Sequence, residues 1–97
     1  MRISAVLERD PVAVAVEVTA DHLVVELDDG RTISAPLEWY PRLAHGTPEE
    51  RDNYEIWGEG TAVSWPDLDE DLSVESILAG RRSGESRRSF ERWLAAR

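Results

Sequence analysis

Two stretches of the sequence alternate between apolar and other side chains with a period of two, and this pattern constrains the fold most. The first is residues 12–18, with valine at every second position, and the second is residues 23–27. Successive side chains of a strand point to opposite faces, so both stretches predict β-strands, the first with its valines on one side. Asp29-Gly30 predicts a two-residue hairpin turn, after which residues 32–35 return antiparallel.

A second hairpin is predicted further along the chain. Residues 54–56 alternate in the same way, residues 58–60 contain two glycines that turn the chain, and residues 62–65 form the returning strand. The pattern therefore predicts five strands in two hairpins. Residues 3–5 indicate a further edge strand, which Pro11 separates from the first hairpin.

Short helices are predicted by their capping residues. Thr47 begins one of them, and Glu50 stands three positions later as the second half of a capping box. Ser73 caps a second helix over residues 74–79, and Gly80 supplies the left-handed residue that ends it.

The segments on either side of that second helix are an acidic loop and an amphipathic helix. Residues 66–71 are predicted as the loop. Either Ser83 or Ser86 can cap the last helix, and Glu85 favours the earlier start because it would then lie in the first turn. The apolar face of this helix consists of Phe90, Trp93 and Leu94.

Hairpins followed by helices indicate an α+β fold, a small antiparallel sheet of two hairpins with short helices and a C-terminal amphipathic helix. A chain of 97 residues has the size of one small domain. We expect a single domain over residues 1–80, followed by a basic helical tail over residues 81–97.

The composition excludes several classes of site. There is no cysteine, so disulfides, thiol nucleophiles and thiolate metal sites are excluded, and the only imidazoles are His22 and His45. The sequence has no nucleophile elbow and no glycine-rich phosphate loop. We expect a protein that is not an enzyme and that has no metal or cofactor. No run is apolar enough for a membrane span or a secretory signal, which predicts a cytoplasmic protein without membrane contact.

The charge is unevenly distributed along the chain. The whole chain has a net charge of −9, but residues 1–75 hold 5 arginines against 18 acids, which is −13, and residues 76–97 hold 6 arginines against 2 acids, which is +4. An acidic surface repels nucleic acids and attracts cationic partners. The natural partner is therefore a small basic protein.

The densest acidic segment, residues 67–71, has three interpretations. Asp67, Asp69 and Asp71 have the spacing of the first ligands of a calcium loop, but Leu72 and Leu78 stand where that loop requires glycine and a bidentate glutamate. The acids also precede the helix capped by Ser73 and favour its positive end. In the third interpretation they form an exposed docking surface for arginine or lysine of another protein. The last two interpretations are compatible with each other.

The aromatic residues add candidates for that surface. Trp57 and Trp65 end the two strands of the second hairpin and are predicted to be buried. Trp39 and Tyr40 lie in a proline-bounded turn, which makes them the better candidates for a partly exposed contact. The predicted partner-binding residues are Trp39, Tyr40, Asp67, Asp69, Glu70 and Asp71.

The basic tail has its own alternatives. It could fold back on the acidic domain, meet the same face of a second copy in a homodimer, or neutralise phosphates of a nucleic acid. Direct contact with nucleic acid is disfavoured by the acidic domain. The residues that would carry it are Arg81, Arg82, Arg87 and Arg88.

Three segments carry a resemblance to a known family. They are Leu-Asp-Asp-Gly-Arg at residues 27–31, Pro-Leu-Glu-Trp-Tyr-Pro-Arg-Leu at residues 36–43, and Trp-Pro-Asp-Leu-Asp-Glu-Asp-Leu-Ser-Val at residues 65–74. In this order they resemble the bacterial family known as domain of unknown function 2442. The resemblance implies a small α+β domain. It also implies, for some members, a short basic neighbour in a toxin and antitoxin arrangement, and for others a fused helix-turn-helix module.

The sequence therefore leads to three expectations about function. The first is a non-enzymatic, antitoxin-like module whose acidic surface masks a small basic partner protein. The second is a regulatory accessory that contacts nucleic acid through the arginine-rich tail. The third is a small hydrolase or isomerase that uses carboxylates, with one pocket that gathers two carboxylates of raised pKa as its structural sign.

Overall fold

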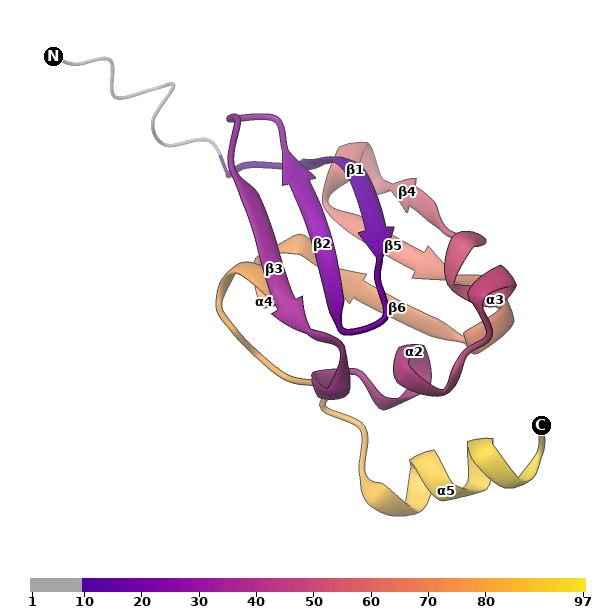
Figure 1. The fold of residues 1–97 in the computed structure, drawn as a ribbon. Helices are drawn as coiled ribbons and strands as arrows, with labels where there is room; N and C mark the ends of the chain where they lie inside the picture. The colour runs from indigo at the N-terminus through magenta and orange to yellow at the C-terminus, as the bar shows by residue number, and fades with distance from the viewer. Residues whose placement is uncertain (1–9) are drawn as a thin grey trace, which may run out of the picture.

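The computed structural model describes residues 10–97, which form two three-stranded antiparallel sheets, several short helices and one longer helix at the carboxyl end (Figure 1). The predicted α+β class is confirmed. The edge strand expected at residues 3–5 lies outside the described residues.

The first sheet has the order β1-β2-β3 and contains the first predicted hairpin. Its strands are β1 (Ala13–Val18), β2 (His22–Leu27) and β3 (Thr32–Pro36). The turn between β2 and β3 is closed by the Gly30 amide, which donates to the Leu27 carbonyl at 3.2 Å. Gly30 has a φ of 94°, a conformation that glycine adopts without steric cost, so the chain turns at the predicted Asp-Gly pair. The loop is one residue longer than the predicted two-residue turn, because Leu27 donates to the Arg31 carbonyl and residues 28–30 form the connection.

The valines of β1 do not all share one face, because a β-bulge interrupts the strand. Ala13 pairs with Leu27 and Ala15 pairs with the adjacent Glu26, so one extra residue, Val14, is accommodated between them. Val14 is 57% exposed, whereas Val16 is buried. The expectation of valines on a single side is therefore wrong at Val14.

The second sheet has the order β4-β5-β6 and contains one strand more than predicted. Its strands are β4 (Glu55–Trp57), β5 (Ala62–Trp65) and β6 (Glu70–Ser73). The segment predicted as an acidic loop is instead a 3₁₀ turn, Pro66–Leu68, followed by β6, which pairs with β5 and buries Leu72.

The two tryptophans of this sheet lie on opposite faces. Trp65 is fully buried and donates its indole N–H to the Arg51 carbonyl at 3.1 Å. Trp57 pairs with Ala62, three residues before Trp65, and is 52% exposed. The predicted burial is confirmed for Trp65 and wrong for Trp57.

Most helices begin at the predicted caps. Thr47 and Glu50 form the capping box of α3, and the Ser73 hydroxyl accepts from the Ser76 amide at the start of α4. The last helix is capped by Ser86, not by the favoured Ser83. The helices are α2 (Pro41–His45), α3 (Pro48–Asp52), α4 (Val74–Leu78) and α5 (Arg87–Ala95).

One hydrophobic core joins the inner faces of both sheets. Its fully buried side chains include Leu23 and Val25 from the first sheet, Val63 and Trp65 from the second, and Leu43 from α2. Helix α5 has no buried residue. Figure 1 shows it beside α2, away from both sheets, so its position depends on surface contacts.

Candidate functional site

A groove of about 820 Å³ lies along β6. Strand β6 forms one wall, and the opposite wall is the segment between α4 and α5, residues 81–86, which we call the strap. Tyr40 and Arg42 also line the groove, and Trp57 lines it from β4. Its volume falls in the range of sites that hold a ligand of drug size.

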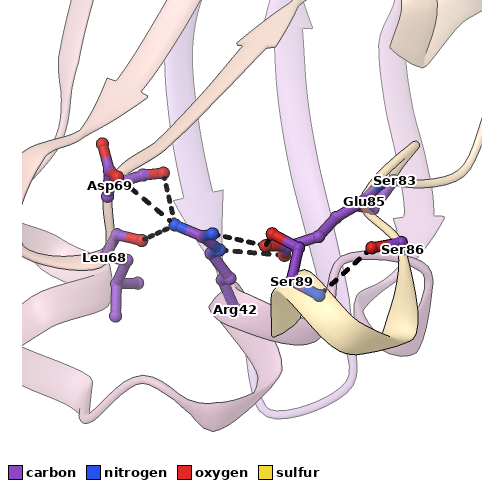
Figure 2. Close-up of polar contacts among 7 residues, drawn as sticks. All are labelled: Arg42, Leu68, Asp69, Ser83, Glu85, Ser86 and Ser89. Carbon is purple, nitrogen blue, oxygen red and sulfur yellow. Dashed lines mark hydrogen bonds and ion pairs between the residues drawn. The ribbon is translucent and has the colours of Figure 1, made fainter. Parts of the chain in front are cut away.

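Arg42 connects the two walls (Figure 2). Its guanidinium forms a two-pronged ion pair with Glu85 of the strap, in which Nε donates at 2.9 Å and Nη2 donates to the second oxygen. Nη1 donates to the Asp69 carbonyl at 3.0 Å and lies 3.5 Å from its carboxylate. The ion pair lowers the pKa of Glu85 and raises that of Arg42.

The ion pair between Arg42 and Glu85 also lies where α5 attaches to the rest of the domain. Ser89 donates its hydroxyl to Glu85 at 2.7 Å. The Phe90 ring contacts His45 of α2 edge-on, with ring centres 5.1 Å apart. The guanidinium groups of Arg42 and Arg97 lie over the Trp93 ring, 5.1 Å and 4.6 Å from its centre. These contacts combine charged, cation–π and aromatic interactions, and Trp93 also packs against the core, so charged groups are one part of what holds α5 and the strap in position.

Among the groups that line the groove, the carboxyl group of Glu70 has the most strongly shifted pKa. Its Oε2 atom is buried and has no hydrogen-bond partner among residues 10–97. Burial raises the pKa of Glu70 to about 7, against the opposing effect of the Arg42 charge. The charges of Glu85 and Asp71 raise this pKa by smaller amounts, and a backbone hydrogen bond from Asp71 lowers it.

The two aromatic candidates differ from each other in exposure, and only Tyr40 departs from the predicted partial exposure. Tyr40 is 1% exposed, and its hydroxyl donates to the Arg81 carbonyl at 3.4 Å. Burial and the charge of Glu70 raise the pKa of Tyr40. The expectation that Tyr40 is exposed is therefore wrong. Trp39 is half-buried, with the guanidinium of Arg82 5.1 Å from its ring centre.

Most of the acidic candidates are brought together. Asp69, Glu70 and Asp71 line the groove with Tyr40, and the carboxylates of Asp69 and Asp71 are exposed. Asp67 lies outside this lining, where it accepts from the Asn53 side-chain amide at 2.9 Å. Among residues 10–97, no group of three or more potential metal ligands is arranged to hold an ion.

The arginines considered for nucleic acid divide into two groups. Arg81 and Arg82 belong to the strap and line the groove opposite the acids. Arg87 and Arg88 are exposed in the first turn of α5. The structure therefore does not gather the four into one patch within the groove.

Arg42 and Glu85 are the important residues that the sequence does not reveal. They are 43 positions apart, and neither lies in a motif that pairs them. One local hint at the role of Glu85 is its position in the strap, where it is an acid among arginines.

Comparison with known proteins identifies relatives without an assigned activity. A family model described as "Protein of unknown function (DUF2442)" matches residues 13–83. No curated protein matches the chain significantly. No helix in the described part of the chain is long and apolar enough to cross a bilayer.

Two solved structures share the fold. A protein of unknown function from Rhodospirillum rubrum, in a crystal structure, is 25% identical with a TM-score of 0.68, and the match covers 79% of this chain and 95% of that one. An uncharacterized protein from Chromobacterium violaceum, solved by NMR, is also 25% identical with a TM-score of 0.63, over 88% of this chain and 74% of that one.

Proposed function

The chain belongs to the DUF2442 family of proteins of unknown function, and we propose that it is a non-enzymatic module that binds and masks a small basic protein, in the manner of an antitoxin. The observation that carries this proposal is that most acids of the folded body are exposed although the last residues of the chain form a basic tail. Residues 10–75 are the part of that body that the structure describes.

The tail neutralises little of the body. Among the described residues, Arg97 forms an ion pair with Glu50 at 2.7 Å, and no other arginine of the tail forms one with the body. Arg82 contacts a tryptophan ring, not a carboxylate. Asp71, on the β6 wall of the groove, is exposed. The side chain of Asp69 is 90% exposed although it lies beside Arg42.

An acidic surface of this kind acts mainly on encounter and on specificity. It raises the association rate of a cationic partner, and added salt reduces the effect because the exposed charges are screened. The exposed Trp57 at the end of the groove offers an apolar contact, of the type that supplies affinity at interfaces. In this proposal Glu70 takes part in no chemical step. The proposal also places the protein in the cytoplasm.

The proposal is tested by removing charge in one place and comparing the result with removal elsewhere. In the first variant, Asp67, Asp69 and Asp71 are replaced by asparagine. Asparagine also suits the left-handed conformation of Asp69, whose φ is 51°. The control replaces the exposed Glu17, Glu26 and Glu38 by glutamine, which changes the net charge equally.

Both variants are expressed in the native host, and the proteins that co-purify are compared quantitatively. We expect a basic protein that is recovered with the wild type and the control but depleted with the asparagine variant. Equal recovery with both variants would refute the acidic-surface mechanism. Glu70 is left unchanged because its burial would confuse a loss of binding with a change in stability.

The nucleic-acid alternative is supported by one observation, the exposure of Arg87 and Arg88 without an ion pair in the described structure. It predicts that a gel shift of the full chain is lost when both residues are replaced by glutamine. The absence of any shift, with or without the basic partner, would remove this alternative.

A further inference from the structure

Strand β6 is the edge of the second sheet that faces the groove. The sheet order is β4-β5-β6, so β6 pairs with β5 on one side only. Its four residues, Glu70–Ser73, line the groove. An edge strand exposes backbone N–H and C=O groups that can pair with another chain.

The register shows which backbone groups point into the groove. Val74 donates to the Thr61 carbonyl at 2.9 Å, and these two residues stand directly opposite each other at the end of the ladder. In an antiparallel pair, hydrogen-bonded and non-hydrogen-bonded positions alternate. Leu72 therefore bonds to β5, whereas the backbone groups of Asp71 and the amide of Ser73 point away from β5 and toward the groove. The Ser73 carbonyl instead accepts from the Ser76 hydroxyl at 2.8 Å.

The strap leaves this edge uncovered. The backbone of the strap forms hydrogen bonds with other segments. The Ser83 amide donates to the Trp39 carbonyl at 2.9 Å, and the Arg81 amide donates to the Ser76 carbonyl at 3.0 Å. Among the described residues, no hydrogen bond joins the strap to the backbone of β6. The groove between them, about 820 Å³, separates the two walls.

We propose that an extended segment of a basic protein adds to β6 in this groove as a fourth strand of the second sheet. This inference rests on the proposed function and specifies how the partner is held. Backbone bonds to Asp71 and to the Ser73 amide would supply affinity, as in other cases of strand addition. An arginine or lysine of the segment placed opposite Asp71 would form a cross-strand pair of opposite charge.

Charge also decides between a foreign segment and a second copy of this chain. Pairing β6 with β6 of another copy would bring Asp71 and its acidic neighbours close to like charges, which destabilises a cross-strand pair. Acidic residues on an edge thus discourage self-association and favour a cationic strand. On the outer face, Trp57 lies on β4, on the same side of the sheet as Asp71, and is available to pack on the stem of a long cationic side chain.

The test uses a synthetic peptide with arginine at alternate positions, acetylated and amidated at its ends, titrated into the full chain at low salt. Two modified peptides are N-methylated on the odd or on the even residues. An added strand turns only one of these sets toward β6. We therefore expect one methylated peptide to lose about tenfold or more in affinity while the other changes far less.

Two variants of the protein complete the test. Asp71→Pro removes the outward N–H together with the charge, whereas Asp71→Asn removes the charge alone. The proline variant should bind the unmodified peptide more weakly than the asparagine variant, with circular dichroism used to check that both are folded. If the proline variant does not fold, the two methylated peptides still decide the matter.

The outcomes separate this inference from the proposed function. Equal binding of both methylated peptides, with binding still reduced when Asp67, Asp69 and Asp71 are neutralised, overturns strand addition and leaves the acidic-surface function intact. If the unmodified peptide does not bind, strand addition is also overturned, and the function is then judged by co-purification alone.

Discussion

Replacing Glu70 by glutamine should stabilise the protein at neutral and alkaline pH. The carboxyl group has an ordinary pKa of 4.5, which we take for the unfolded chain, and a pKa of about 7 in the folded protein. Between these values the unfolded chain has lost the proton that the folded chain retains. Raising the pH through this interval therefore favours unfolding, and stability lost there is not regained above pH 7.

The size of the effect follows from the two pKa values. At about 1.4 kcal/mol for each pKa unit, the full difference corresponds to about 3 kcal/mol. Glu70 retains partial contact with solvent, which screens the effect, so we expect a gain of about 1–2 kcal/mol in the free energy of unfolding at pH 8. For a chain of this size, 1 kcal/mol raises the Tm by about 4–8 °C.

The assay is urea denaturation of the wild type and of Glu70→Gln at a series of pH values from 4 to 8. Glu55→Gln, a change at an exposed residue of the same sheet, is the control. The two curves of stability against pH should converge near pH 4.5 and separate as the pH rises to 7. A Glu70→Gln variant that is no more stable than wild type at pH 8 would refute the reasoning.

Two further predictions concern two turns of the fold and the attachment of α5. Gly60→Ala should cost about 2–4 kcal/mol in the free energy of unfolding, because Gly60 has a φ of 89° and an added Cβ would lie 2.8 Å from the Ala13 carbonyl oxygen. Gly30→Ala, with a φ of 94° but nothing within 4 Å of the new Cβ, should cost only about 1 kcal/mol by the same denaturation assay, and equal losses would contradict the role given to the contact. Glu85→Gln should weaken the attachment of α5, so that the hydrogen-exchange protection factors of residues 89–95 fall while those of β2 and β5 stay unchanged. Acidification below the lowered pKa of Glu85 should lower the same protection factors, once the slower intrinsic exchange at acid pH is taken into account. Unchanged exchange in α5 would show that Arg42 and Glu85 do not hold it.

The predictable parts of the fold are those decided by neighbouring residues. Asp29-Gly30 forces a turn, and Thr47 and Ser73 satisfy free amides at the starts of α3 and α4. Each of these depends on groups within a few positions, so the sequence alone is sufficient to find it.

The parts that the sequence missed depend on contacts between distant residues. Strand β6 has two acids among its four residues and exists because β5 offers it a partner. The bulge at Val14 and the outward position of Trp57 are consequences of register, which the alternation of side chains does not fix.

The candidate site could likewise be predicted only in part from the sequence. The acids at residues 69–71 do line one groove, as a clustered segment must. The approach of the strap to that segment depends on the pairing of Arg42 with Glu85, 43 residues apart, and on the side-chain packing that buries Tyr40. Neither is visible in local patterns.

The most direct test of the account is the affinity of the arginine-bearing peptide for three proteins: the wild type, the variant with asparagine at Asp67, Asp69 and Asp71, and the control with glutamine at Glu17, Glu26 and Glu38. At low salt, the asparagine variant should bind about tenfold more weakly than the wild type, the control should lose much less, and the difference should shrink as salt is added. If both variants lose affinity equally, the peptide responds only to net charge, and the acidic wall along β6 is not the binding surface.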